Sequence, residues 1–284
     1  MVSSRPSKNS NSRPFDFDVS AWPPLPKLAG LFVTGTDTEV GKTLVAGAIA
    51  RCLRRRGRRV EVFKPVATGC RRGPNAPGLI SADAEFLAGC ADSRRPLAEI
   101  TPVRYATAVA PNVAAAREHR PVDLEAVFDA YRRLEGAAEA VIVEGVGGLM
   151  CPITDDFWVV HLAVMMRLAV VIVARAGLGT INHTLLTLHA ARSVGLEVAG
   201  VVVNRYRVEP QAAQQLADPS QPYTHGDADL AIYTNPQQIA QRGGVDVLAI
   251  VPDEPANSVE RATIGPDTQF AIDQVDWERL IGLR

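Results

Sequence analysis

GLFVTGTDTEVGKTLVAGAIARCLRRR, which runs from Gly30 to Arg56, joins a short apolar strand, a glycine-bounded turn and an apolar helix. In such a turn, backbone N–H groups can face a phosphate, and the helix N-terminus adds the positive end of its dipole. Lys42 is placed to meet the β- and γ-phosphates, and the Thr43 hydroxyl to ligate Mg²⁺. Five residues separate Gly35 from Gly41, one more than in the common phosphate-binding loop. The alternative, a tight turn with an incidental lysine, fits this strand–loop–helix context poorly.

Short β-branched runs alternate with segments of helical period along most of the chain, which predicts a mostly parallel sheet with helices on both faces. The expected strands are 30–33, 60–63, 140–143, 169–173, 198–203 and 245–251, and the expected helices are 41–56, 82–88, 124–134, 157–166 and 182–194. The carboxyl ends of parallel strands share one edge, where open α/β sheets bind ligands. The predicted fold is therefore a single α/β domain of the P-loop NTPase type.

Composition favours one domain with a large core, since 47% of the 284 residues are hydrophobic. Residues 1–27 are rich in Ser, Asn, Arg and Pro and lack the apolar segment of a secretory signal. They are predicted to be a disordered tail, which leaves 28–284 as the domain. Residues 205–235 contain Pro210, Pro219 and Pro222 among many Gln, Asp and Ala residues, which predicts a surface insertion.

The net charge and the cysteines indicate which binding partners and which cellular compartment to expect. Thirty Lys and Arg residues against 31 Asp and Glu give a net charge of -1, so no field gathers nucleic acid or an anionic membrane. The basic run Arg54 to Arg59 is expected to be a solvated helix end rather than an RNA patch. No apolar stretch reaches about 18 residues, so no membrane span is expected. The near-zero net charge therefore favours a small-molecule substrate. Four scattered cysteines without metal-ligand spacing are typical of a reducing compartment, and indicate a cytoplasmic protein.

Two acids are candidates for a nucleotide-bound metal. Glu144 ends the predicted strand AVIVE, and a carboxylate is costly to bury there unless a positive group such as Mg²⁺ awaits it. The alternative is a surface acid that enters the glycine-rich loop 145–148. Asp83 lies in the first turn of a predicted helix, where metal binding is no more favoured than ordinary capping or interaction with the helix dipole.

Six motifs, in this order, resemble those of the dethiobiotin synthetase family. They are GTDTEVGKT, KPVATG at 64–69, APNVAA at 110–115, VEGVGG at 143–148, GLGTINH at 177–183 and VAGVVVN at 198–204. The combination of the longer loop with KPV-x-[ST]-G is specific, and the resemblance covers 31–204. It implies a homodimer that uses ATP and Mg²⁺ to join CO₂ to 7,8-diaminopelargonate. Carbamate and carbamoyl-phosphate-type intermediates would lead to dethiobiotin, ADP and phosphate.

The same resemblance assigns roles to individual residues. Thr43, Asp83 and Glu144 match the metal ligands, and Lys64 and Lys42 match catalytic cations that can stabilise charge in phosphoryl transfer. For Lys64 the alternative is a solvated surface charge. The substrate-binding set is Thr38, Lys64, Thr68 and Asn182. Asn182, at a predicted helix start, would receive the substrate carboxylate of the second subunit, and could also cap its own helix.

The nucleotide-binding set implied by the resemblance is Glu39, Val40, Gly41, Lys42, Thr43, Leu44, Asp83, Glu144, Gly145, Val146, Gly147, Asn204, Arg205, Pro252, Asp253 and Glu254. Asn204 resembles the asparagine that bonds adenine, because an amide pairs a donor with an acceptor. Its alternative is a turn residue after a strand. The 205–235 segment weakens the match on the adenine side. His161 stands where many relatives have an acid, and nothing in the sequence explains it.

Three other kinds of protein share a phosphate-binding loop: a cobyrinate-type synthetase and two non-catalytic switches. A cobyrinate-type synthetase carries a glutaminase domain, and roughly 80 residues after Asn204 leave no room for a domain of ~100 residues. A partitioning-type ATPase switch has a second lysine where Thr36 and Asp37 stand. A guanine-specific switch needs N-K-x-D, whereas Asn204 is followed by Arg-Tyr-Arg.

Overall fold

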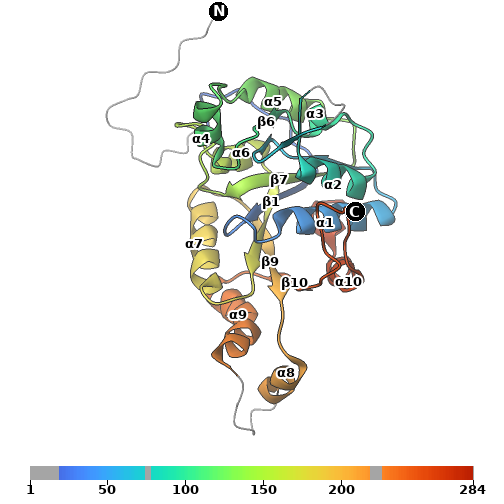
Figure 1. Cartoon of the computed structure of the whole chain (residues 1–284), viewed down its shortest axis with the longest axis vertical. Coiled ribbons are helices and arrows are strands. Elements are labelled where there is room, and N and C mark those ends of the chain that lie inside the picture. The colour runs from blue at the N-terminus through green and yellow to red at the C-terminus, as the bar shows by residue number, and fades with distance from the viewer. Residues whose placement is uncertain (1–18, 74–77, 218–225, 284) are drawn as a thin grey trace, which may run out of the picture.

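The largest sheet of the protein is built from the six apolar runs that the sequence predicts as strands. A computed structural model of the chain describes residues 19–73, 78–217 and 226–283. The strands of this sheet are β1 (Gly30–Gly35), β2 (Val60–Phe63), β7 (Ala140–Gly148), β8 (Ala169–Arg175), β9 (Val198–Tyr206) and β10 (Val247–Pro252). They lie in the order β10-β9-β8-β1-β7-β2, and every pairing is parallel. The predicted α/β class is confirmed (Figure 1).

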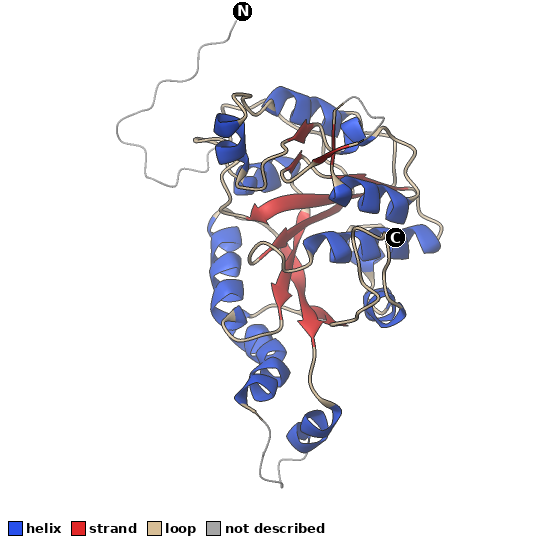
Figure 2. Cartoon of the chain, viewed as in Figure 1, coloured by secondary structure: helices blue, strands red, loops and turns tan. Residues whose placement is uncertain are grey.

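Helices cover both faces of this sheet (Figure 2). The larger ones are α1 (Lys42–Arg55), α2 (Ala82–Ala91), α4 (Pro111–Arg117), α5 (Leu124–Arg132), α6 (Val159–Met166), α7 (Thr180–Ser193), α8 (Pro210–Ala217), α9 (Asp227–Gly243) and α10 (Pro266–Asp273). Short elements complete the described chain: β3 (Val66–Ala67), β4 (Arg71–Arg72), β5 (Leu79–Ile80), α3 (Leu97–Ile100), β6 (Val103–Arg104) and α11 (Trp277–Leu280). None of the helices in the described part of the chain is long and apolar enough to cross a membrane.

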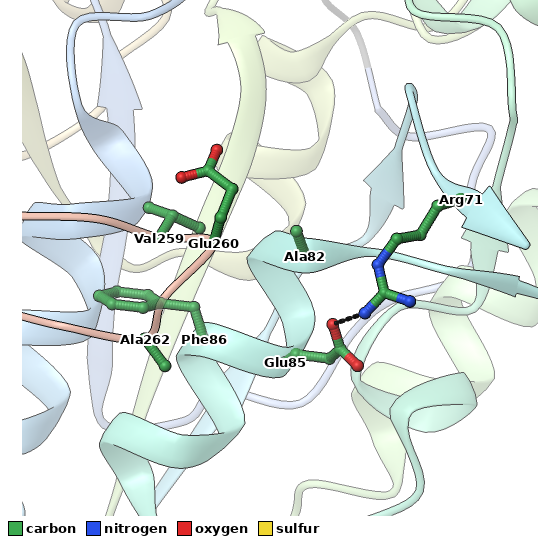
Figure 3. A pocket seen from close by; sticks show the side chains of 7 residues that line it. All are labelled: Arg71, Ala82, Glu85, Phe86, Val259, Glu260 and Ala262. Atoms are coloured by element: carbon green, nitrogen blue, oxygen red, sulfur yellow. Dashed lines mark hydrogen bonds and ion pairs between the residues drawn. The ribbon is translucent and has the colours of Figure 1, made fainter. Parts of the chain in front are cut away.

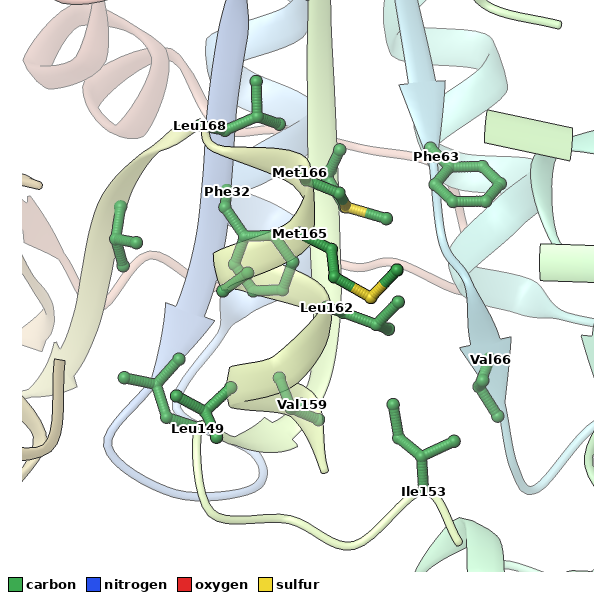
Figure 4. Packing of buried hydrophobic residues seen from close by; sticks show 14 of the residues in the cluster. Phe32, Phe63, Val66, Leu149, Ile153, Val159, Leu162, Met165, Met166 and Leu168 are labelled. Atoms are coloured by element: carbon green, nitrogen blue, oxygen red, sulfur yellow. The ribbon is translucent and has the colours of Figure 1, made fainter. Parts of the chain in front are cut away.

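Successive residues of β1 enter two different cores. Leu31 and Val33 join the cluster built around α1, α2 and α11, whereas Phe32 joins the cluster built around α5 and α6. Figure 4 shows Phe32 beside α6 residues such as Leu162 and Met165. All three β1 side chains are fully buried, and burial of each contributes about 1.5–3 kcal/mol. This two-sided burial explains why the strand reads as a continuous apolar run.

The close approach of α1 and α2 sets the position of the α2 N-terminus. A Cβ atom on Gly47 of α1 would lie 2.3 Å from Cε1 of Phe86 and 3.0 Å from Sγ of Cys90. Only glycine leaves room for this contact, because backbone and ring already touch. The first turn of α2, which carries Asp83, is thereby held beside the start of α1.

The predicted disordered tail, 1–27, is wrong for its last nine residues, 19–27. Leu25 is buried, and the Trp22 ring lies 4.9 Å from that of Phe157 in an edge-on contact. Nη2 of Arg167 also donates a hydrogen bond to the Leu25 carbonyl, at 2.9 Å. The apolar side chains of Trp22 and Leu25 thus hold residues 19–27 on the domain, although the composition of residues 1–27 as a whole predicts disorder. Residues 1–18 lie outside the described residues.

The structure also corrects the boundaries 205–235 of the predicted insertion. Strand β9 continues to Tyr206, and α9 begins at Asp227 and runs through Pro236. Nδ2 of Asn235, a buried residue, donates to the carbonyl oxygen of Ala176 at 2.7 Å. Packing on α7 and this bond outweigh the helix-breaking tendency of proline, so both ends of the segment belong to the fold. Residues 218–225 lie outside the described residues.

The basic run Arg54 to Arg59 begins in the last turn of α1 and continues into the loop before β2, with Arg58 half-buried and the other residues exposed. Acidic residues lie beside it. Arg58 contacts Glu278 at 2.5 Å and Glu139 at 3.6 Å, and Arg55 lies 3.4 Å from Asp273. The interpretation as a solvated helix end is confirmed.

Candidate active site

The phosphate-binding loop has the geometry that the sequence predicts, between β1 and α1. Gly41 is the N-cap of α1 and adopts φ 90°, a left-handed conformation that favours glycine. The first turn of α1 holds no acid, so its leading N–H groups are available to an anion. Nζ of Lys42 folds back to donate to the Asp37 carbonyl at 2.8 Å. Burial lowers the pKa of Lys42, and Glu144 opposes this effect.

Lys64 is the centre of a buried ionic cluster. It directly follows β2, and its backbone N–H is fixed by the Ile100 carbonyl at 2.9 Å. Nζ lies 2.7 Å from Oε1 of Glu144 and 2.8 Å from Oδ2 of Asp83. The Lys64 side chain is only 5% exposed, so the alternative of a solvated surface lysine is wrong.

Glu144 lies in the middle of β7 rather than at its end, because the strand continues through the glycines to Gly148. This corrects the predicted strand boundary at 143. The residue is 1% exposed, so the surface-acid alternative is also wrong. Oγ1 of Thr43 donates to Oε1 of Glu144 at 2.8 Å. The second carboxylate oxygen, Oε2, is buried without a hydrogen-bond partner among the described residues.

Asp83 is the second residue of α2 and does not cap it. Ser81 is the N-cap, and its hydroxyl accepts a hydrogen bond from the Ala84 N–H at 3.3 Å. The capping alternative for Asp83 is therefore wrong, and its carboxylate is turned to Lys64. The three residues predicted as metal ligands therefore form one cluster: Asp83 and Glu144 both contact the Lys64 ammonium, and Thr43 bonds to Glu144.

The charges in this cluster stabilise one another. Burial alone would lower the pKa of Lys64, but Glu144 and Asp83 outweigh that effect and raise it, so the ammonium form persists. For Asp83, burial alone would raise the pKa, but the nearby Lys64 ammonium outweighs burial and the pKa is lowered. For Glu144 burial prevails and raises the pKa, because Lys64 offsets it only in part.

The donor set fits Mg²⁺. Two carboxylates and a hydroxyl offer the oxygen atoms that this ion prefers, and it ordinarily completes its shell with water and substrate phosphates. The unpartnered Oε2 of Glu144 is the atom in most need of a cation. The donor set contains only two carboxylates, Asp83 and Glu144. Among the described residues, no group of three or more His, Cys, Asp or Glu residues could hold a metal ion.

The predicted substrate-binding residues lie on three segments. Thr38 is exposed in the loop, and its N–H donates to Oδ1 of Asp37 at 2.7 Å. Thr68 is half-buried just after β3. Asn182 is exposed as the third residue of α7, so it lies in the first turn at the start of this helix, as predicted. The helix begins two residues earlier than expected and its N-cap is Gly179, so the alternative that Asn182 caps it is wrong.

Asn204 lies inside β9 and is 1% exposed, so the turn alternative is wrong. Its Nδ2 donates to the Val40 carbonyl at 2.8 Å. Arg205 beside it is exposed with φ 57°. The Asp253 N–H donates to the Tyr206 carbonyl at 3.0 Å, which holds the ends of β9 and β10 together.

The remaining residues predicted to bind nucleotide differ in what they contact. Glu254 accepts from the Thr268 N–H at 3.0 Å and thus caps α10. Leu44 is buried against Phe86 and Cys90. Glu39 is exposed, Gly145 is buried, and Val146, Gly147 and Pro252 are half-buried.

Sequence reasoning missed a cavity of 280 Å³ beside the first turn of α2 (Figure 3). It is lined by Arg71, Ala82, Glu85, Phe86, Val259, Glu260 and Ala262. Arg71 and Glu85 form an ion pair at 2.8 Å across its side. No motif marks these residues, because three chain segments without a shared pattern build the wall.

His161 also has a physical explanation in the structure. Its Nδ1 accepts a hydrogen bond from the Trp158 N–H at 2.8 Å, which closes the N-terminus of α6. The ring stacks on Phe157 with centroids 5.1 Å apart. Its role is structural.

Comparison with known proteins identifies the family. A family model described as an AAA domain matches residues 29–261. The ATP-dependent dethiobiotin synthetase BioD of Anaeromyxobacter sp. (strain Fw109-5) is 40% identical over 222 residues, which are 78% of this chain and 89% of that protein. The chain belongs to the dethiobiotin synthetase family. The BioD protein of Bacillus subtilis (strain 168) is 35% identical over 225 residues, 79% of this chain and 87% of that relative. The resemblance stated from the motifs is confirmed.

Solved structures extend the likeness of this dethiobiotin synthetase family member to a wider fold. MinD in the MinC:MinD cell division complex of Aquifex aeolicus has a TM-score of 0.53 at 15% identity, covering 90% of this chain and 96% of that one. A variant of McdA of Cyanothece, solved in complex with ATP, has a TM-score of 0.51 at 13% identity, covering 90% of this chain and 97% of that one. Identities this low speak for the fold alone.

Proposed function

We propose that the protein closes the cyclic urea of dethiobiotin on 7,8-diaminopelargonate, a step of biotin biosynthesis. One amine adds to CO₂ and loses a proton to give a carbamate. The carbamate oxygen takes the γ-phosphoryl group of ATP and ADP leaves, after which the second amine attacks the carbonyl carbon and expels phosphate. The observation that carries the proposal is the buried Lys64 ammonium held beside the phosphate-binding loop, in a family named for this reaction.

The residues of the loop and of the cluster would divide the work. The first turn of α1 and Lys42 would bind the triphosphate. Lys64 would stabilise the carbamate oxygen and the charge that moves during phosphoryl transfer, and its two carboxylate contacts keep it protonated for that task. Because Lys64 is rigidly held, little reorganisation is needed when this charge develops.

Thr43, Asp83 and Glu144 would hold Mg²⁺. When bound, this ion would neutralise charge on the phosphate oxygens. The support is the buried, unpartnered Oε2 of Glu144 together with the adjacent Thr43 hydroxyl.

We further propose a homodimer in which Asn182 meets the substrate carboxylate of the neighbouring subunit. Leu186, one helical turn after Asn182, is 59% exposed, and Leu178, in the loop just before α7, is 82% exposed. Residues four apart share a helix face, so Asn182 and Leu186 lie on one exposed face of α7, and the exposed Leu178 precedes it; exposed apolar side chains of this kind suit a protein contact. Thr38 and Thr68 would complete the diamine site.

On the nucleotide side, we propose that adenine lies near Asn204, Pro252 and Asp253. The hydrogen bond between Asp253 and Tyr206 brings these strand ends together, which supports the assignment. The thiols of Cys52, Cys70, Cys90 and Cys151 are all free, which supports a reducing, cytoplasmic setting.

The test is ATP turnover by purified protein with Mg²⁺ and bicarbonate, with and without the diamine, followed by mass analysis of the product. We expect ADP and dethiobiotin in equal amounts and little turnover without diamine. Lys64→Gln should abolish the product, whereas Lys27→Gln, at an exposed lysine, should leave it unchanged. ATP hydrolysis that ignores the diamine would instead favour an ATPase switch.

A further inference from the structure

The side chain of Asn204 is bonded to the phosphate-binding loop itself. Nδ2 donates to the Val40 carbonyl at 2.8 Å, across 164 positions of sequence. The carbonyl can only accept, so the amide nitrogen must face it and the orientation of the side chain is determined. With 1% exposure, this bond is shielded from competing water.

The bonded carbonyl belongs to the peptide that joins Val40 to Gly41. In a trans peptide the C=O and the following N–H point in opposite directions. By holding the Val40 carbonyl, Asn204 therefore directs the Gly41 N–H to the other side. That N–H begins the series of free donors at the N-terminus of α1.

A second contact fixes the same peptide. A Cβ atom on Gly41 would lie 2.0 Å from Nδ2 of Asn204, so the amide packs directly on the glycine. The backbone at Gly41, with φ 90°, is one that other residues rarely adopt. Asn204 thus contacts the loop at a residue whose left-handed backbone conformation favours glycine.

We infer that Asn204 is a positioning residue for the phosphate-binding loop, which it keeps in the shape that binds phosphate whatever base the nucleotide carries. The inference rests on the proposed binding of a triphosphate at this loop, and it is separate from the proposed adenine contact. Oδ1 of Asn204 is buried and has no hydrogen-bond partner among the described residues.

The experiment compares the affinities of ATP, GTP and inorganic tripolyphosphate, each with Mg²⁺, by calorimetry on the full chain. Asn204→Leu keeps the approximate volume but removes the donor. We expect it to weaken all three ligands by the same factor, about 10-fold or more, which corresponds to one buried hydrogen bond. Asn235→Ala is the matched control, because this buried asparagine also holds a carbonyl, that of Ala176, in another loop. It should leave all three affinities unchanged.

A selective loss of ATP affinity, with tripolyphosphate unaffected, would overturn the inference and make Asn204 a reader of the base. Equal losses in the Asn235 control would overturn it too, since general destabilisation would then explain both. If the wild-type chain binds none of the three ligands, the proposed function fails together with the inference. Should Asn204→Leu not fold, Asn204→Ala with the same ligands provides the comparison.

Discussion

Replacing Lys64 by methionine removes the only cation that contacts both Glu144 and Asp83 among the described residues. Methionine has a similar length and suits an apolar site, so the change isolates the charge. The ammonium lies 2.7 Å and 2.8 Å from the two carboxylates. Glu144, which is 1% exposed, would be left as an uncompensated buried charge, whereas the more exposed Asp83 can be solvated.

The expected loss of stability depends on the balance between the attraction of the charges and the cost of removing them from water. At an effective dielectric constant of 20, each contact of about 2.8 Å contributes roughly 6 kcal/mol of attraction, against desolvation of several kcal/mol for each ion. The intact cluster is therefore close to neutral for stability. Removal of one partner from a buried pair costs about 3–5 kcal/mol, because the other charge stays buried. For a domain of this size that corresponds to a decrease in melting temperature of roughly 6–20 °C.

The assay is urea unfolding without nucleotide, followed by the fluorescence of buried Trp277 and the other tryptophans. Lys64→Met should lower the free energy of unfolding by the stated amount, and the double variant with Glu144→Leu should recover most of it. Lys27→Met, at an exposed position, is the control and should have little effect.

The pH dependence provides a second criterion for Lys64→Met. Burial raises the folded pKa of Glu144, so the folded state binds this proton more tightly than the unfolded state. The corresponding stability is present below the unfolded pKa of about 4.3 and is lost as pH rises through the folded value. Lys64→Met removes the ammonium that partly offsets burial, so the folded pKa of Glu144 should be higher still in the variant, and its stability deficit should shrink as pH falls. A deficit below about 1 kcal/mol, or no recovery in the double variant, would refute the account of the cluster.

Three further predictions concern other contacts. Gly41→Ala should abolish tripolyphosphate binding, measured by calorimetry, because its Cβ meets Asn204 at 2.0 Å; Gly57→Ala, with φ 85° and open space around it, should cost only the backbone strain of about 1–2 kcal/mol and keep binding. Leu25→Ala should lower the free energy of unfolding by about 2–5 kcal/mol in urea titrations, and a chain that starts at residue 28 should lose at least as much; no loss in either would restore the disordered-tail reading. Lys64 lowers the folded pKa of Asp83 against the effect of burial, so its contribution to stability is present above the unfolded pKa of about 3.9 and is lost as pH falls. The difference in unfolding free energy between wild type and Asp83→Asn should thus be constant from pH 6 to pH 8 and vanish in acid.

The central strands could be predicted because local sequence reports their burial directly. Leu31, Phe32 and Val33 are apolar in succession, as only a strand covered on both faces requires. Helix α9 could not be predicted in this way, because Pro236 argues against a helix locally. Its support comes from α7 and from the Asn235 bond to Ala176, which join distant parts of the chain. The anchoring of Trp22 depends on Phe157 in the same manner.

In the active site too, the sequence predicts which residues matter but not which atoms they contact. Motif resemblance selects Lys64, Asp83 and Glu144 individually, and their spacing leaves capping and solvent exposure open. Only the fold reveals that Ser81 caps α2 and that Lys64 lies between both carboxylates. The cavity beside Phe86 has no sequence signal at all, since its walls come from α2, β4 and the 258–263 turn.

The fold alone would not distinguish this chain from the MinD protein of Aquifex aeolicus, which has a similar fold at 15% identity. We expect the chemistry to depend on what the neighbouring strands add to the phosphate-binding loop. Lys64 directly follows β2, β7 carries Glu144 and β9 carries Asn204. Asn204 bonds to the loop, Glu144 bonds to Thr43 at the start of α1, and Lys64 reaches Thr43 through Glu144. Parallel strands on either side of β1 deliver these groups to one edge. A change in the residue at one strand position can therefore alter the reaction without altering the fold, and Lys64 is the position at which we expect the synthetase chemistry to be decided.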